Sequence, residues 1–291
     1  MLDLNLIEEI LFYNKPHLLE ISNIDSVLEW DDVNKLLGSG LLDYPRIRVA
    51  NSDNEYSKNY DGFIRYNFSD RGEKQAWVVP GVIYKNLRDG CTVIIDRCET
   101  YFPKVKEIVE KVESSLSCQA WANLYISPRG CSGFKCHFDD HDVLAIQVHG
   151  RKLWKIYEPT HSSPNRGDKS FYLQPPHGKA YAQEQLNSGK VIYVPYGYWH
   201  AVETLSPLSL HISIGLDFPR RLDMIGLIRM ELAKDKYFRD RLACSTSSKD
   251  FKQRCIEAID NMDIDEMIHR LQQKNIGRRG FDIYGTLGGE E

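Results

Sequence analysis

The chain has 291 residues, 42% of them hydrophobic and 11% aromatic, which allows a sizeable core and argues against wholesale disorder. A formal net charge of −4 and a pI of about 6.2 carry no strong signal for nucleic-acid binding. Seven cysteines without a C-x-x-C pair argue against a disulfide framework or a structural zinc knuckle. They favour a reducing compartment, so we expect a cytoplasmic protein.

Residues 1 to about 40 have the pattern of short helices. The start, "MLDLNLIEEILFYNKPHLLE", is amphipathic and acidic and lacks the basic region of a signal peptide, whereas "NIDSVLEWDDVNKLLGSG" has helical apolar spacing and a glycine stop. Residues 41–75 are polar and predict loops with short strands. No apolar run reaches the roughly 18 to 20 residues of a membrane span, so we expect no membrane segment.

The pattern of apolar and polar residues changes after residue 75. A short helix is predicted at 81–90, a strand at 91–96 and an amphipathic helix at 101–117. Short strands then follow closely, at 122–127, 142–148, 151–157, 190–195 and 208–216. Many short strands separated by Gly and Pro turns are typical of a sandwich or barrel.

Two connections in this region have predicted roles. The segment "VHGR", which contains His149, has the pattern of a hairpin turn between two of the strands. Residues 160–189 are rich in Pro, Gly, His and Tyr and are expected to form a loop that shapes the entrance to the barrel.

After Pro219 the pattern becomes helical again, with helices predicted at 221–243, 249–262 and 265–275. The fold class is therefore mainly β with α additions. We expect an N-terminal helical and loop elaboration over residues 1–75, a β-barrel core over 76–217 and a C-terminal helical unit over 218–291.

Ionisable side chains crowd the stretch "CHFDDHD". His137 and Asp139 are two apart, so in a strand they share a face. Together with one distant histidine they would form a set of two imidazoles and one carboxylate, which binds Fe(II) and leaves coordination positions open. His200, which follows a Pro-Tyr-Gly turn in "VIYVPYGYWHAV", is the third candidate ligand.

These residues can also be explained without a metal. A His-x-Asp pair is of low specificity and is usually a surface turn, and a lone histidine is more often simply hydrogen-bonded. His141 forms H-x-x-x-H with His137, a spacing that binds zinc on a helix, but the flanking pattern is that of a strand. We therefore expect His141 to lie beside the site without being a ligand.

Lys152 alternates with two core-type residues in "RKLWKIY", sharing a face with Trp154 and Ile156. A charged lysine on an apolar face needs an anion beside it, unless its stem is buried and its ammonium reaches water. Two further strands carry polar stripes that either face solvent or line a polar barrel interior. Lys152 and the candidate ligands favour the interior. The stripes are Asn123, Tyr125 and Ser127, and Ser209, His211 and Ser213.

Residues 121–159 and 189–215 carry a resemblance to a known family. The combination of His-x-Asp, G-R-K-x-W and a distant histidine resembles the JmjC-type 2-oxoglutarate oxygenases, nearest to their ribosomal-oxygenase (cupin-4 type) branch, over about residues 76–217. This similarity implies a double-stranded β-helix of the cupin or jelly-roll type.

The resemblance also implies the site residues. Fe(II) would be held by His137, Asp139 and His200, and Lys152 would bind the distal carboxylate of 2-oxoglutarate. Further co-substrate pocket positions implied by the family are Asn123, Tyr125, Ser209 and His211. The C-terminal helices occupy the place of the family's dimerisation helices, so a homodimer is expected.

The function expected from this resemblance is hydroxylation of an amino-acid side chain in a protein or peptide, using Fe(II), 2-oxoglutarate and O₂. Demethylation of N-methyl-lysine or N-methyl-arginine is the related outcome. Two different functions stay open. One is that of a cupin metalloenzyme, a dioxygenase or an isomerase, that has the same ligands but uses no 2-oxoglutarate. The second is that of a non-catalytic interaction module.

Overall fold

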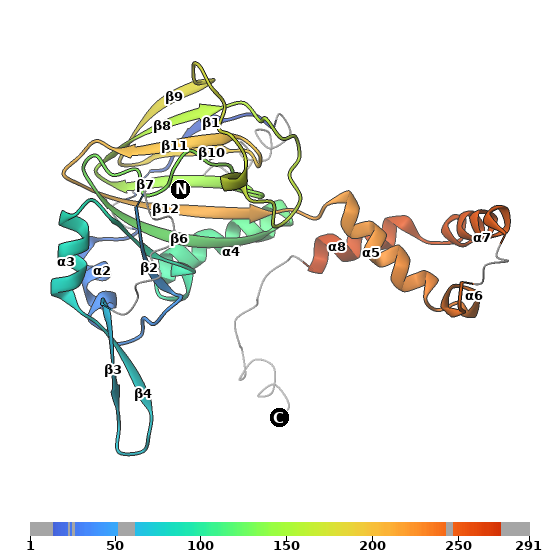
Figure 1. The fold of residues 1–291 in the computed structure, drawn as a ribbon, viewed down its shortest axis with the longest axis horizontal. Helices are drawn as coiled ribbons and strands as arrows, with labels where there is room; N and C mark the ends of the chain where they lie inside the picture. Colours follow the sequence, from blue (N-terminus) through green and yellow to red (C-terminus); the bar gives the residue numbers. More distant parts are fainter. Residues whose placement is uncertain (1–13, 23, 25–26, 52–61, 243–246, 275–291) are drawn as a thin grey trace, which may run out of the picture. The chain divides into compact units, whose positions relative to one another are not determined.

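The computed structural model describes residues 14–22, 24, 27–51, 62–242 and 247–274 (Figure 1). The helix expected at the very start of the chain falls within residues 1–13 and so lies outside the described residues. The chain divides into two compact units, the first taking in residues 1–115 and 120–217, and the second residues 116–119 and 218–291.

Two antiparallel sheets make up most of the first unit (Figure 1). The larger sheet has the order β1-β10-β7-β12-β6-β5-β2, and the smaller has the order β11-β8-β9. The strands of the larger sheet are β1 (His17–Glu20), β2 (Ile47–Ala50), β5 (Thr92–Ile95), β6 (Gln119–Pro128), β7 (Asp142–His149), β10 (Lys190–Val194) and β12 (Leu208–Asp217). Those of the smaller sheet are β8 (Arg151–Tyr157), β9 (Ala182–Asn187) and β11 (Trp199–Thr204).

The two sheets pack face to face over a shared apolar core. Alternate residues of β8 are buried, as the period of a strand requires, and they meet the inward residues of β7 and β10. The cluster comprises Val143, Ala145, Ile192 and Val194 from the larger sheet and Trp154, Ile156 and Leu186 from the smaller. This arrangement is a double-stranded β-helix, so the predicted fold class, mainly β with α additions, is confirmed.

Helices and a hairpin complete the first unit. The helices are α2 (Trp30–Leu37), α3 (Pro80–Arg88) and α4 (Pro103–Leu116), with 3₁₀ turns at Cys98–Thr100 and Ser170–Tyr172. Proline at the first helical position suits α3, because the missing N–H would have no partner within the helix. Strands β3 (Ile64–Phe68) and β4 (Lys74–Val78) pair as a separate hairpin. The helices predicted at 81–90 and 101–117 are confirmed.

Two segments predicted as helix or loop are strands. Residues 17–20 were expected to belong to short helices, but they form β1 and pair with β10, where Leu19 lies opposite Val191 and is buried. Residues 182–187 were expected to lie in a loop, but they form β9 beside β8. In both cases the long-range backbone pairing outweighs the local pattern.

The predicted hairpin at "VHGR" is also wrong. β7 and β8 do not pair with each other, because β7 lies between β10 and β12 while β8 lies between β11 and β9. Gly150, with a φ of +77°, makes the sharp turn between the sheets. The ring of His149 stacks on Trp30 at a centroid distance of 5.7 Å. The chain therefore crosses from one sheet to the next at this turn.

The second unit is helical, with α5 (Arg221–Leu232), α6 (Lys236–Arg239), α7 (Ser248–Asp260) and α8 (Ile264–Lys274). The helix predicted at 221–243 is thus divided. A new helix starts after Asp235, whose side chain accepts a hydrogen bond from the backbone N–H of Tyr237 at 2.9 Å. None of the helices in the described part of the chain is both long and apolar enough to cross a bilayer.

Candidate metal and co-substrate site

Two of the candidate ligands are joined by backbone hydrogen bonds. His137 lies in an irregular segment before β7, and His200 is the second residue of β11. The N–H of His137 donates to the carbonyl of His200 at 3.1 Å, and the N–H of His200 donates to the carbonyl of His137 at 2.7 Å. The expected regular strand over 137–139 is absent from the described structure. An isolated β-bridge brings these distant residues together instead.

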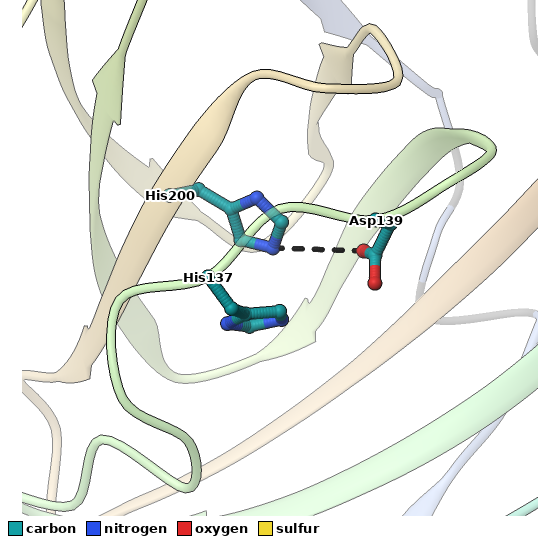
Figure 2. A group of neighbouring side chains, drawn as sticks. All are labelled: His137, Asp139 and His200. Carbon is teal, nitrogen blue, oxygen red and sulfur yellow. Dashed lines mark ion pairs between the residues drawn. The ribbon is translucent and has the colours of Figure 1, made fainter. Parts of the chain in front are cut away.

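Figure 2 shows the side chains of His137, Asp139 and His200 pointing toward one another. One donor atom from each lies within 4.8 Å of the others, and His200 Nε2 is 3.7 Å from a carboxylate oxygen of Asp139. Donor atoms bound to one ion at about 2.1 Å lie about 3 to 4 Å apart, so a small adjustment suffices to bind a metal. The structure therefore brings together the three residues predicted as ligands.

Both imidazoles present the correct nitrogen to this position. His137 Nδ1 lies 2.8 Å from the carbonyl oxygen of Lys135, and His200 Nδ1 lies 3.3 Å from that of Tyr198. A hydrogen bond from Nδ1–H to a carbonyl leaves Nε2 with its lone pair free for a metal, which is the usual arrangement of histidine ligands.

The charges of the set also suit a cation. Burial and the neighbouring His137 lower the pKa of His200 to about 4, although Asp139 acts in the opposite direction. Burial tends to raise the pKa of Asp139, but the imidazoles of His141, His137 and His200 outweigh it, and the net pKa is lowered. Near neutral pH His200 is therefore neutral and Asp139 is ionised, which are the forms that bind metal.

Lys152 lies inside the same pocket. Its side chain is 4% exposed, and its ammonium donates a hydrogen bond to Ser127 Oγ at 3.0 Å. Burial lowers the pKa of Lys152 to about 7, with only Cys131 acting to raise it. No carboxylate of the described residues forms an ion pair with this amine, which lines the pocket. A buried amine of this kind favours an anionic ligand.

The pocket has a volume of about 260 Å³ and is lined by polar side chains from two strands of the larger sheet. Asn123, Tyr125 and Ser127 of β6 line it, as do His211 and Ser213 of β12. These polar stripes therefore face the barrel interior and not solvent. The structure does not place Ser209 in this lining: its hydroxyl accepts a hydrogen bond from Gln147 Nε2 at 2.8 Å.

Buried aromatic and imidazole rings form one wall of the pocket. Tyr125 and His211 stack at a centroid distance of 4.6 Å, 11° from parallel. Burial, then the charge of Asp139, raises the pKa of Tyr125, whereas burial and Lys152 lower the pKa of His211 well below its usual range. Two buried nitrogens that belong to pocket-lining residues, His211 Nδ1 and Trp154 Nε1, have no hydrogen-bond partner among the described residues. Such groups are available to a bound ligand.

His141 lies beside the metal position and outside the donor set, as expected from the sequence. Its Nδ1 is 3.0 Å from Asp140 Oδ1, and its ring lies 4.7 Å from that of Trp121. The hydrogen bond with His141, together with one from the backbone N–H of Gly167, lowers the pKa of Asp140 to about 2 despite partial burial. His141 and Asp140 thus form part of the pocket wall.

Several residues that line the pocket were not predicted as site residues, and Arg48, Thr92 and Trp121 are three of them. Arg48 of β2 lines the pocket and donates two hydrogen bonds to Asp96, at 2.5 and 2.8 Å. Its segment has the composition of a loop, so it carried no local signal. Thr92 of β5 also lines the pocket, from a strand that was predicted without any site residue. Trp121 is two residues before Asn123, and the same alternation could have identified it.

The fold and the site together define a double-stranded β-helix protein of the cupin kind, with a candidate metal centre built from two histidines and one aspartate. Residues 98–224 match the family described as the JmjC domain. This part of the chain, which contains the candidate ligands and Lys152, is therefore similar to the JmjC domain.

Curated proteins are similar to this chain over the same region. Over 211 residues the chain is 27% identical to the bifunctional lysine-specific demethylase and histidyl-hydroxylase NO66 of Dictyostelium discoideum, a match that covers 70% of this chain and 39% of that protein. The chain spans less than half the length of the curated relatives it matches first.

Solved structures show the same fold. The X-ray structure of E. coli ycfD has a TM-score of 0.62 at 17% identity, covering 97% of this chain and 74% of that chain. The ribosomal oxygenase YcfD from Escherichia coli in complex with cobalt and 2-oxoglutarate has a TM-score of 0.55 at 16% identity, covering 92% and 69%.

Proposed function

We propose that this protein is an Fe(II)- and 2-oxoglutarate-dependent oxygenase that hydroxylates an amino-acid side chain in a protein or peptide. One observation carries the proposal: the His137–Asp139–His200 donor set and the buried amine of Lys152 lie in one pocket. A metal position that shares a pocket with a cation, for which the described residues provide no ion-pair partner, suits a small dianion that binds at both ends.

The chain's own residues would divide the work in the following way. His137, Asp139 and His200 would hold the metal, with the two Nδ1 atoms directed to backbone carbonyls. Lys152 would pair with the distal carboxylate of 2-oxoglutarate, and the Tyr125 and His211 rings would enclose the co-substrate and exclude water. Fe(II), 2-oxoglutarate and O₂ would supply the oxidative chemistry.

The test of this proposal is a turnover assay on the full chain. We expect succinate to form from isotope-labelled 2-oxoglutarate in the presence of Fe(II), and candidate peptides to gain the mass of one oxygen atom. Omission of iron or of 2-oxoglutarate should stop both products. A peptide oxidised equally well without 2-oxoglutarate would contradict the proposal.

Demethylation of N-methylated side chains is a second candidate, because the Dictyostelium relative is named as both a demethylase and a hydroxylase. The products separate the two reactions. Hydroxylation adds one oxygen to the peptide, whereas demethylation removes the mass of a methylene group and releases formaldehyde. A panel of methylated and unmethylated peptides of the same sequence would show which reaction predominates.

Two functions that do not involve 2-oxoglutarate fit the pocket less well. A cupin metalloenzyme that does not use this co-substrate leaves the position of Lys152 without a role. A non-catalytic interaction module does not explain a donor set in which both histidines present Nε2 to one point. The pocket therefore favours the oxygenase.

We also propose a cytoplasmic location. The support is the odd number of cysteines and the lack of C-x-x-C spacing among them, which suit a reducing compartment.

We further propose that the C-terminal helices mediate a homodimer. Helix α5 has no buried residue in this single chain, and it exposes Leu222 by 66%, Ile225 by 58% and Met230 by 61%. Complete burial of such a side chain contributes about 1.5–3 kcal/mol, so a second copy is a suitable partner for these side chains.

Light scattering tests the dimer. We expect twice the mass of one chain for the wild type and the mass of one chain for Ile225→Glu, since a carboxylate cannot be buried in an apolar interface without a large cost. Lys234→Glu, an exposed charge change just beyond the same helix, is the matched control and should stay dimeric. A monomeric wild type would overturn the proposal.

A further inference from the structure

A buried carboxylate lies between the ligand-bearing segment and the turn that leads to His200. Asp142 is the first residue of β7 and is 7% exposed. Its Oδ1 accepts one hydrogen bond from the backbone N–H of Tyr196, at 2.7 Å, and one from the hydroxyl of Tyr193, at 3.2 Å. Asp142 is not a member of the donor set that converges on the metal position.

The turn at 195–198 is held to the ligand-bearing segment by two successive backbone amides. The N–H of Tyr196 donates to the side chain of Asp142, and the N–H of Gly197 donates to the carbonyl of Asp139 at 3.0 Å. Gly197 has a φ of +81°, which L-residues with a side chain rarely adopt. The turn therefore has one defined conformation, and residues 139 and 142 anchor it.

The position of this turn sets the orientation of the His200 side chain at the metal position. His200 follows the turn closely, and its Nδ1 faces the carbonyl of Tyr198, a residue of the turn itself. A shift of the turn would move this carbonyl and rotate the imidazole relative to Asp139. Metal sites tolerate only about 0.5 Å of such displacement before affinity falls.

We infer that Asp142 is a positioning residue, which holds the 195–198 turn so that His200 and Asp139 meet at one metal ion. The inference rests on the metal-binding part of the proposed function. Loss of the carboxylate would leave the N–H of Tyr196 without this acceptor, and the turn would relax to satisfy it. Asp142 belongs neither to the donor set nor to the pocket lining, so its effect on the metal would be indirect.

A purely structural role for Asp142 predicts a different result. It would lower the stability of the metal-free and metal-loaded protein equally, and metal affinity would not change. A positioning role predicts weaker metal binding in protein that is still folded, so the readout must be affinity and not activity.

The experiment is a titration of the full chain with Co(II), followed by the d–d absorption of the bound ion. We expect Asp142→Ala to weaken cobalt binding by about 10- to 100-fold, the usual effect of removing a group that orients a ligand. Asp142→Asn retains an acceptor oxygen for the turn and should restore affinity close to that of the wild type. Tyr193→Phe removes the hydrogen bond from the tyrosine hydroxyl to Asp142, leaves the turn anchored, and should not change cobalt affinity.

Each outcome decides between the roles. Equal cobalt affinity and an identical absorption spectrum for Asp142→Ala and the wild type would overturn the inference and leave the proposed function intact. A wild type that binds no cobalt would overturn the proposed function, and this inference with it. If Asp142→Ala does not accumulate as folded protein, the cobalt titration is carried out with Asp142→Ser, whose hydroxyl is too short to reach the turn. The same expected and contradicting results then apply to this variant.

Discussion

Replacing Asp139 by alanine is expected to abolish metal binding and iron-dependent turnover while the barrel stays folded. Asp139 provides the only carboxylate of the donor set in the described residues. Its removal leaves two imidazoles, and changes to groups that only support a ligand already cost about 10- to 100-fold in affinity. We therefore expect cobalt affinity to fall by more than about 100-fold, and His137→Ala to have a similar effect.

The measurement is the cobalt titration together with succinate release, with circular dichroism as the check of folding. Asp89→Ala is the matched control, since this exposed carboxylate pairs with Lys85 on α3 and lies outside the pocket lining. Full metal affinity and turnover in the Asp139→Ala variant would show that the assignment of the ligand set is wrong.

The second large effect is expected at Lys152. In Lys152→Ala the distal carboxylate of 2-oxoglutarate would enter a buried site without its cation. Truncating one partner of a buried, hydrogen-bonded charge pair costs about 2–5 kcal/mol. We therefore expect the KM for 2-oxoglutarate to rise by at least about 30-fold, with a smaller change in kcat at saturation.

The low pKa of Lys152 adds a pH dependence to this prediction. With a pKa of about 7 in the protein without co-substrate, the amine is charged below pH 7 and neutral above it. A dianion binds the charged form, so binding above pH 7 requires uptake of a proton. The KM for 2-oxoglutarate should therefore rise with pH above 7 in the wild type.

Two variants test the origin of these effects. Lys152→Arg carries a charge at all accessible pH values, so its KM should lack the rise above pH 7. Lys155→Ala is the matched control, because Lys155 lies on the opposite face of β8 and outside the pocket lining. An unchanged KM in Lys152→Ala would show that the lysine does not bind the co-substrate.

The local residue pattern was sufficient to predict many of the strands of the barrel. The alternation of polar and apolar residues in 122–127 and 151–157 predicted both the strands and the side chains that face the interior, because side chains in a strand point to opposite faces with a period of two. The same reasoning identified Lys152 as an inward cation. His137 and Asp139 were recognised from their spacing and from the family resemblance together.

Several features of the structure could not be predicted from the local residue pattern. Residues 17–20 and 182–187 became strands only because β10 and β8 offered unpaired edges. The strand register shifts between Leu210 and His211, and the structure places His211 in the pocket lining and Ser209 outside it. A strict alternation would place both side chains on one face, so sequence could not separate them.

The order of residues was sufficient to predict the period of each strand and the chemical identity of the groups that face inward, because both follow from neighbouring residues. Which distant groups meet depends on the three-dimensional fold. The bridge between His137 and His200 and the bond from Tyr196 to Asp142 join segments more than fifty residues apart. Such contacts depend on the pairing of two sheets, and local propensity carries no information about that pairing.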